Sequence, residues 1–378
     1  MKIVIAPDSF KESLSALEVA DAIAEGWQKV IPDTECICIP MADGGEGTVQ
    51  SLIDATHGRW LSVDVTAPLG NTVRAEFGIS GDGKTAIIEM AAASGLHLVP
   101  IEKRNPLITT SYGTGELIKA ALDQGVAKII LGIGGSATND AGAGMLQALG
   151  AVFWDQDGVA LGFGGGALIN TAHVDFSKLD PRLQQVELDV ACDVNNPLCG
   201  EKGASAIFGP QKGASPEMVA TLDKALHHFA TVIQQQHGLD IRHHAGAGAA
   251  GGMGGGLLTL PNVVLKAGVQ IVNEAVNLAE AIRDADLVIT GEGRMDAQSA
   301  HGKAPIGVAG VAKQFGKPVI AIVGCLREDY EVVYQHGIDA VFPIIRQLGT
   351  LDTVLANGRY NLISAAQNIA KLYQMNMR

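Results

Sequence analysis

Basic residues are scarce in this sequence of 378 residues. Its 27 Lys and Arg stand against 40 Asp and Glu, which gives a net charge of −13. Proteins that bind nucleic acids or anionic membranes depend on basic surfaces, so we expect neither partner. The sequence also lacks an apolar run near the ~20 residues of a membrane helix, and residues 1–10 lack the apolar region of a signal peptide. We therefore expect a soluble cytoplasmic protein.

Cysteine is also scarce, with five residues spread along the chain: Cys36, Cys38, Cys192, Cys199 and Cys325. The spacing of Cys36 and Cys38 suits opposite faces of a strand rather than a metal-binding knuckle. We expect five reduced thiols, as in cytoplasmic proteins. A nucleophile–base signature of covalent catalysis is missing as well.

Glycine, by contrast, is abundant, with 47 residues or about 12% of the chain against a usual ~7%. The glycines gather in five tracts, at 41–48, 132–145, 208–215, 246–256 and 290–296. Glycine lets the backbone approach a ligand closely and point several N–H groups at one anion. A single tract could merely close a turn, but Asp, Glu, Lys or Asn recurs within nearly every tract. This favours a phosphate-handling site built from several segments.

Strand-like and helix-like runs alternate, which indicates an α/β protein. Near the N-terminus we expect strands at 2–6 and 35–41 around a helix at 15–31, with Ser13 or Ser15 as its cap and Glu18 completing a capping box. Towards the C-terminus we expect strands at 285–290, 318–324 and 339–344 and helices at 305–315 and 351–375.

The middle of the chain has a different pattern. Short strands at 60–65, 73–79 and 85–90 form a meander, and further helices and strands follow, among them a helix at 139–149. We therefore expect a parallel-sheet domain of residues 1–60 plus 286–378, interrupted by a second α/β domain of residues 61–285. The cleft between two such domains is the usual place for a small-molecule site, and we expect the active site there.

Residues 78–85, GISGDGKT, match the P-loop pattern letter by letter. A P-loop follows a buried strand and opens a helix. Here the preceding residues alternate in polarity and the following ones are strand-like, so we interpret the segment as a hairpin turn.

Residues 132–137, GIGGSA, resemble a dinucleotide fingerprint, with Asp155 near the position of a ribose-binding acid. However, hydroxyl, amide and carboxylate groups crowd the start of the expected helix, at Ser136, Thr138, Asn139 and Asp140. A carboxylate there would repel a pyrophosphate but suits a hydroxyl-bearing substrate or Mg²⁺. An NAD(P)-dependent oxidoreductase is therefore a less favoured alternative.

Polar loops follow three expected strands at the carboxyl edge of the parallel sheet, where α/β proteins bind ligands. Their chemically useful residues are Asp8, Lys11, Asp43, Glu46, Glu292, Arg294 and Asp296. Candidate cations for an anionic substrate are Lys11, Lys202, Lys212, Arg294 and Lys303. The uncharged tract 246–256 is either a flexible hinge or, as we favour, a loop that closely approaches a ligand.

Six segments together resemble the bacterial glycerate kinase type 1 family: APDSFKESLSA, PMADGGEGT, GIGGSATNDAGAGM, DVNNPLCGEKGASAIFGPQKGA, AGAAGGMG and VITGEGRMDAQSAHGKAP. The resemblance implies a flavodoxin-like domain interrupted by a second α/β domain. It also implies an ATP- and Mg²⁺-dependent kinase that converts D-glycerate to 2-phosphoglycerate. Two residues depart from what the resemblance leads us to expect, Glu12 in place of Gly and Ser299 in place of Thr.

Phosphoryl transfer needs positioning and charge neutralisation rather than a covalent intermediate. Candidate catalytic residues are Asp296, Asp43 and Lys11, with either Asp296 or Asp43 as the base. Candidate glycerate ligands are Asp8, Ser9, Arg294, Asn139 and Asp140, with Lys11 or Arg294 facing the carboxylate. Candidate phosphate-binding residues are Gly44, Gly45, Gly134, Gly135, Ser136 and Lys212. Asp193 and Glu292 are candidate Mg²⁺ ligands.

Some alternatives remain open at this stage. A kinase forming 3-phosphoglycerate would show the same motifs, and a two-domain sensor of sugar acids would need a DNA-binding or signalling segment that is not visible. D-glycerate is the expected small-molecule partner, and a homodimer is an assembly to test.

Overall fold

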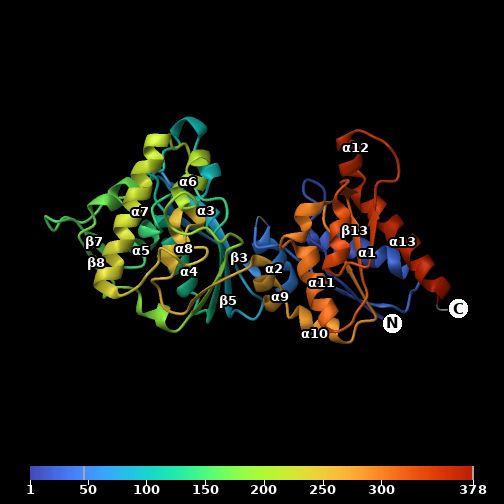
Figure 1. The fold of residues 1–378 in the computed structure, drawn as a ribbon. Helices are drawn as coiled ribbons and strands as arrows, with labels where there is room; N and C mark the ends of the chain where they lie inside the picture. The colour runs from blue at the N-terminus through green and yellow to red at the C-terminus, as the bar shows by residue number, and fades with distance from the viewer. Residues whose placement is uncertain (46, 377–378) are drawn as a thin grey trace. The chain divides into compact units, whose positions relative to one another are not determined.

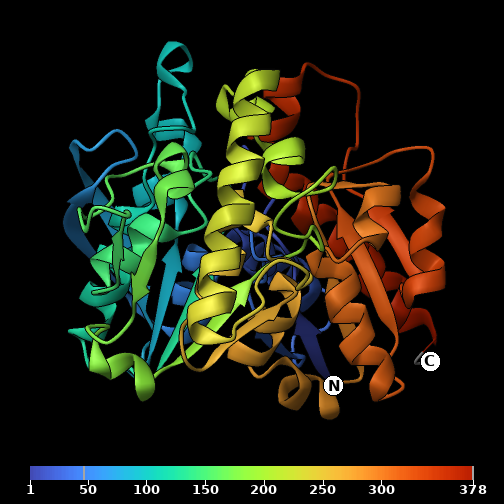
Figure 2. The same cartoon turned by 60° about the vertical axis from the view of Figure 1, so that its left-hand side comes forward.

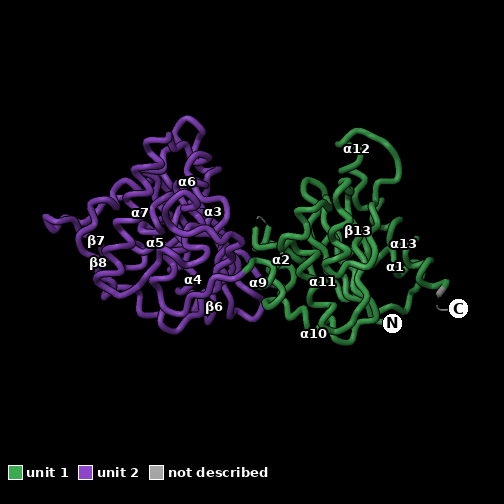
Figure 3. Tube along the Cα trace, viewed as in Figure 1, with its two compact units in different colours: residues 1–57, 267–378 green, residues 58–266 purple. Residues whose placement is uncertain are grey.

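The computed structural model describes residues 1–45 and 47–376, so Glu46 lies outside the described residues. It divides into two compact units, residues 1–57 with 267–378 and residues 58–266 (Figures 1 and 3). The first unit thus combines both ends of the chain. Residues 267–285, which we expected in the interrupting domain, belong to this first unit, because helices α9 (Gly268–Ala275) and α10 (Leu278–Arg283) pack with α11 (Ala304–Gln314).

The first unit is built on a five-stranded sheet whose strands are all parallel. The order is β15 (Ala340–Pro343), β13 (Val319–Val323), β11 (Leu287–Thr290), β1 (Lys2–Ile5) and β2 (Glu35–Cys38). The chain changes direction across the sheet between β1 and β11, so the loops after these two strands leave the same edge side by side.

Helices cover both faces of this sheet (Figures 1 and 2). Helix α1 (Ala16–Gln28) packs with α13 (Gly358–Asn376) over Ile3, Ile5, Leu287 and Ile289. Ser15 caps α1, and Glu18 completes the predicted capping box. The expected helix at 351–375 is instead two helices, α12 (Leu351–Ala356) and α13, because the Asn357 side chain donates to Thr353 O and Gly358 follows.

The second unit contains a six-stranded mixed sheet. Its order is β10 (Val263–Lys266), β9 (Glu187–Ala191), β6 (Lys128–Gly132), β5 (Thr85–Glu89), β4 (Thr72–Ile79) and β3 (Arg59–Thr66). The three strands from β3 to β5 form the expected antiparallel meander, and the others are parallel. The long helix α7 (Pro216–His237) is prominent in Figure 2 and shares a core with the sheet and with α4 (Tyr112–Leu122), α5 (Ala143–Ala148) and α8 (Ala249–Leu257).

The remaining elements are short. They are α2 (Thr48–Thr56), α3 (Ala91–Ser94), α6 (Ala204–Phe208), the pair β7 (Val152–Trp154) and β8 (His173–Asp175), and the pair β12 (Arg294–Met295) and β14 (Cys325–Leu326). All five cysteines are free thiols. Among the described residues, no helix combines the length and apolar character needed to cross a membrane.

Glu12 adopts a left-handed backbone conformation, with φ of 64°. A non-glycine residue is strained in this region, by roughly 1–2 kcal/mol. This explains physically why the family resemblance led us to expect glycine at this position, in the loop between β1 and α1.

Residues 78–85 form the β4–β5 hairpin, as predicted. The Asp82 carboxylate accepts hydrogen bonds from Ser80 Oγ at 2.6 Å and Lys84 N at 3.0 Å, and Gly83 has φ of 73°. Strand β5, rather than a helix, follows the turn. A P-loop geometry is therefore absent from this segment.

Lys84→Ala should accordingly leave kcat and the KM for ATP within about threefold of wild type, because the exposed Lys84 side chain ends a surface turn. Steady-state kinetics on the purified variant checks this. A P-loop lysine contacts the β- and γ-phosphates, so a loss of about a thousandfold, ~4 kcal/mol, would contradict the hairpin interpretation.

Candidate active site

Three loops of the first unit are joined by backbone hydrogen bonds at the carboxyl ends of β1, β2 and β11. Asp8 N donates to Gly291 O at 2.8 Å, and Met41 N donates to Pro7 O at 2.9 Å. Gly293 packs against the backbone of Phe10 and Lys11, where an added Cβ would lie 3.3 Å from Phe10 Cα. The predicted convergence of these loops is therefore present.

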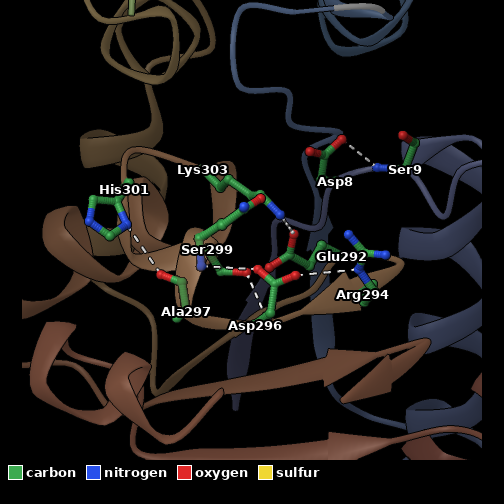
Figure 4. Close-up of polar contacts among 10 residues, drawn as sticks. Asp8, Ser9, Glu292, Arg294, Asp296, Ala297, Ser299, His301 and Lys303 are labelled. Atoms are coloured by element: carbon green, nitrogen blue, oxygen red, sulfur yellow. Dashed lines mark hydrogen bonds and ion pairs between the residues drawn. The ribbon is translucent and has the colours of Figure 1, made fainter. Parts of the chain in front are cut away.

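Asp8 lies half-buried in the first of these loops, and its Oδ1 accepts a hydrogen bond from Ser9 N at 2.6 Å (Figure 4). Burial raises the pKa of Asp8 from 3.8 to about 7; the Ser9 N–H opposes this rise, and the negative charges of Asp43 and Glu292 add to it. A carboxyl with a pKa near neutrality can accept and return a proton.

Glu292 is a buried carboxylate next to a lysine. Only 5% of the residue is exposed, and its Oε2 lies 3.1 Å from Lys303 Nζ. Its Oε1 is buried and has no hydrogen-bond partner among residues 1–45 and 47–376. Burial raises the pKa of Glu292, and the Ser299 hydroxyl and the Lys303 charge oppose the rise. The unpaired oxygen makes Glu292 a site for an incoming cation or donor.

Asp296 has a structural task that sequence reasoning missed. Its Oδ1 accepts from Gln298 N at 3.0 Å, and its backbone N donates to Ser299 Oγ at 3.1 Å, so it caps the 3₁₀ turn Ala297–Ala300. Its Oδ2 lies 3.4 Å from Arg294 Nε. These contacts, drawn in Figure 4, favour Asp296 as the residue that positions Arg294. The Arg294 side chain is 53% exposed.

The other predicted residues of this unit lie in the first two loops. Asp43 is half-buried, and its Oδ1 accepts from Gly45 N at 3.0 Å, so this N–H is already used within the chain. Gly44 has φ of 93°. Lys11 is exposed and borders a hollow of about 520 Å³ that Ser9, Ser13 and Gly47 also line.

Lys212 is the most buried cation of the second unit, with 2% of the residue exposed. It ends the 3₁₀ turn Pro210–Lys212, and its Nζ donates to Ser136 Oγ at 2.7 Å and Thr138 O at 2.6 Å. Burial lowers the pKa of Lys212 to about 7, and the negative charge of Asp140 opposes this change. In this arrangement Lys212 supports the 132–142 loop from within the unit.

Asp140 anchors the same loop. Its Oδ2 accepts from Ser111 N at 2.9 Å, Ser111 Oγ at 2.8 Å and Gly144 N at 3.3 Å, and its Oδ1 accepts from Gly142 N at 3.1 Å. Burial raises the pKa of Asp140, and these hydrogen bonds oppose the rise. Because its lone pairs are used by the chain, Asp140 suits loop positioning better than glycerate binding. The Asn139 side chain donates to Ser205 Oγ at 2.9 Å.

Glycines 134 and 135 are exposed, and Gly135 has φ of 73°. Within the described residues, the N–H groups of Gly134, Gly135 and Ser136 donate to no chain atom. Successive free N–H groups around a left-handed residue form a nest that attracts anions. In its protonated form, Lys212 next to Ser136 strengthens this attraction.

The segment after β6 does not open a helix directly. Helix α5 begins only at Ala143, four residues later than expected, so the dinucleotide fingerprint is not formed. The cause is close backbone packing: Ala141 N donates to Gly251 O at 3.1 Å, and a Cβ at Gly251 would collide with Thr138 O. Tract 246–256 thus closely approaches another loop of its own unit.

The two predicted Mg²⁺ ligands, Glu292 and Asp193, belong to different units. Glu292 is buried in the first, whereas Asp193 is exposed in the second. The described residues contain no group of three His, Cys, Asp or Glu side chains that could hold a metal ion. Mg²⁺ nevertheless takes only one or two carboxylates in kinases and the rest from phosphates and water. The unpaired oxygen of Glu292 beside the charge of Asp8 fits such an ion.

Sequence reasoning missed the partners that give these residues their geometry. They are Lys303 as the ion-pair partner of Glu292, Ser111 as the partner of Asp140, and Ser299 as the partner of Asp296. Lys303 was predicted as a cation for an anionic substrate, but not as the partner of Glu292. Ser299 stood out only as a departure from the Thr that the family resemblance led us to expect, and Ser111 carried no signal beyond being a hydroxyl residue.

Comparison with known proteins gives a consistent result. The model of the Glycerate kinase family matches residues 3–374. A glycerate kinase of Haemophilus influenzae is 68% identical over 372 residues, which cover 98% of each chain. A glycerate 2-kinase of Escherichia coli is 58% identical over 378 residues, covering 100% of this chain and 99% of the relative. The crystal structure of a provisionally named glycerate kinase 2 from Salmonella typhimurium LT2 superposes with a TM-score of 0.93 at 53% identity, covering 100% of this chain and 99% of that one. This chain therefore belongs to the glycerate kinase family.

Proposed function

We propose that this protein is a glycerate 2-kinase, which transfers the γ-phosphoryl group of ATP to D-glycerate and gives 2-phosphoglycerate and ADP. The names of its relatives support the reaction. The observation that carries it is the convergence of Asp8, Asp43 and Glu292 at one sheet edge. Phosphoryl transfer needs such groups to orient a hydroxyl and to hold a metal ion.

We also propose that the first unit is a flavodoxin-like domain. In chain order its strands are arranged 2-1-3-4-5, which is the flavodoxin-like arrangement. Ligands of such sheets bind outside the carboxyl ends of the strands at the point where the order reverses. That point lies between β1 and β11, where Asp8 and Gly291 are hydrogen-bonded.

Proton transfer belongs to Asp8 or Asp43 in this proposal. Both are half-buried at the edge, and their oxygens are only partly used by the chain, by Ser9 N and Gly45 N. Asp296, the other base considered from the sequence, is occupied as a cap and as the partner of Arg294. Arg294 and Lys11 then supply positive charge for the glycerate carboxylate, with Ser9 as a neighbouring donor.

Glu292 and Asp193 are the proposed holders of Mg²⁺, which supplies charge neutralisation on the phosphate oxygens when bound. The charge of Lys303 favours the ionised form of Glu292 and opposes the effect of burial. In the second unit, the N–H groups of Gly134, Gly135 and Ser136 bind phosphate oxygens, and Lys212 supports them. Gly44 adds an N–H in the first unit.

The position of phosphorylation is tested by coupling the product to enolase. With ATP, Mg²⁺ and D-glycerate, we expect phosphoenolpyruvate to form without added phosphoglycerate mutase, because enolase uses 2-phosphoglycerate. Absorbance at the wavelength of phosphoenolpyruvate follows the reaction. A strict requirement for the mutase would mean that the product is 3-phosphoglycerate.

The roles of the carboxylates are tested by Asp8→Asn, Asp43→Asn and Asp296→Ala. Loss of a general base costs ~10²–10⁴-fold in kcat, and we expect this for Asp8→Asn or Asp43→Asn in a protein that still folds and binds ATP. Asp296→Ala removes a cap worth ~1 kcal/mol and loosens Arg294, so it should lower the thermal midpoint and raise the KM for glycerate more than it lowers kcat. Asp64→Asn, on exposed β3, is the matched control. Near-wild-type kcat in both Asn variants would remove Asp8 and Asp43 from the chemistry.

The raised pKa of Asp8 also predicts how pH affects stability and rate. Since the pKa rises from 3.8 to about 7 on folding, the folded state holds this proton more tightly than the unfolded state. Asp8 therefore reduces the free energy of unfolding progressively as pH rises from about 4 to 7. Asp8→Asn should melt at a higher temperature than wild type at pH 8 and at a similar one at pH 4, whereas wild-type kcat/KM should rise through pH ~7. A lower midpoint for Asp8→Asn at pH 8 would contradict the buried, repelled state of this carboxylate.

A further inference from the structure

A polar cavity of about 350 Å³ follows β15 in the first unit, and none of the predicted site residues lines it. Its walls come from the loop after β15, from α12 and from the first turn of α13. The polar and aromatic side chains that line it are Arg346, Gln347, Thr353, Asn357, Tyr360 and Asn361. The volume is in the range of small-molecule sites, and it exceeds what a bare inorganic anion needs.

Arg346 supplies the positive charge of this cavity. Its guanidinium carbon lies 5.1 Å from the centre of the Tyr360 ring, a cation–π contact that holds the group in place. Within residues 1–45 and 47–376, no carboxylate pairs with it and no acceptor takes its hydrogen bonds. Its planar donors are therefore free for a bidentate acceptor.

Asn361 is a second donor with no partner. Only 9% of the residue is exposed, it lines the cavity, and its side-chain amide makes no hydrogen bond to the described chain. An amide at the cavity wall that the chain does not use can donate to a ligand. Gln347 brings another amide to the wall, and neither Asp nor Glu lines it. The donor set thus suits an anion and would repel no negative charge.

The cavity is separate from the point where the strand order reverses. β13 and β11 stand between β15 and β1 in the sheet, so the cavity lies at the far end of the same carboxyl edge from Asp8. We propose that it binds a small metabolite bearing oxyanions, either a phosphate ester or a polycarboxylate, at a site distinct from the catalytic one. The proposal does not depend on glycerate being the substrate.

Calorimetric titration of the full chain tests this, with pyrophosphate and citrate as separate probes. Saturating ADP and glycerate are present throughout, so that the catalytic site is filled without turnover. We expect at least one probe to bind; pyrophosphate alone would identify phosphate esters and citrate alone polycarboxylates. Arg346→Gln should weaken binding at least about tenfold through loss of a charge-assisted bidentate contact.

Two further variants make the outcome decisive. Gln347→Glu is nearly isosteric and exposed, and it should weaken binding similarly by adding a repelling charge, even if Arg346→Gln fails to fold. Arg283→Gln is the matched control, because Arg283 also lies over an aromatic ring, at 5.9 Å from Phe315, outside the cavity. The control should bind like wild type, and both cavity variants should keep kcat and both KM values within about twofold. The proposal would be overturned if neither probe bound, or if both cavity variants bound the probes as wild type does.

Discussion

Burial of carboxylates at one sheet edge is the constraint on which the first unit depends. Parallel strands deliver the ends of β1, β2 and β11 to the same edge, and each is followed by an acid, Asp8, Asp43 or Glu292. Lys303 offsets part of the free-energy cost of burying these carboxylates, through its ion pair with Glu292. The cost that is not offset is visible in the raised pKa of Asp8, and one Glu292 oxygen has no partner among the described residues. A fold that only had to be stable would not keep this arrangement. The arrangement of these three carboxylates is favourable once a bound cation and a substrate hydroxyl interact with them.

In the second unit, backbone N–H groups have to stay available for an anion instead of forming hydrogen bonds within the chain. The unit achieves this by fixing the 132–142 loop from behind. Asp140 collects hydrogen bonds from Ser111, Gly142 and Gly144, Lys212 binds Ser136 and Thr138, and Gly251 allows a second loop to press against the first. These bonds hold the loop from behind, although Thr138 Oγ1 and Asn139 Oδ1 are buried without a partner among the described residues, and Gly134 and Gly135 stay exposed. Hydrogen bonds between buried polar groups are strong and restrict the conformation of the loop.

Local sequence signals predicted the structural features that depend on residues close together in the sequence. The Ser15–Glu18 capping box, the hairpin at 78–85 and the strands of both chain ends are confirmed. The predictions that were wrong concern features that depend on contacts between residues far apart in the sequence. The start of α5 is delayed by Gly251, which is remote in sequence, and residues 267–285 join the first unit through contacts with α11. The occupation of the Asp140 carboxylate depends on Ser111, which lies 29 positions away, and no periodicity encodes that contact. The Asp296 carboxylate is occupied by the nearby Gln298 N and Arg294. The catalytic, substrate-binding and metal-binding assignments stay predictions.

The assembly of the first unit from both chain ends has a consequence for how the protein is made. About 250 residues separate β2 from β11, and at ~5–20 residues per second a ribosome needs roughly 12–50 s to synthesise them. During that interval β1, the strand that later lies between β2 and β11, has an unpaired edge and an uncovered apolar surface. Residues 58–266 emerge complete in the meantime and can fold first. Nascent chains of this protein are thus most prone to aggregate through β1 and β2 before β11 is made. A chaperone that binds the first 57 residues during this interval would prevent such aggregation.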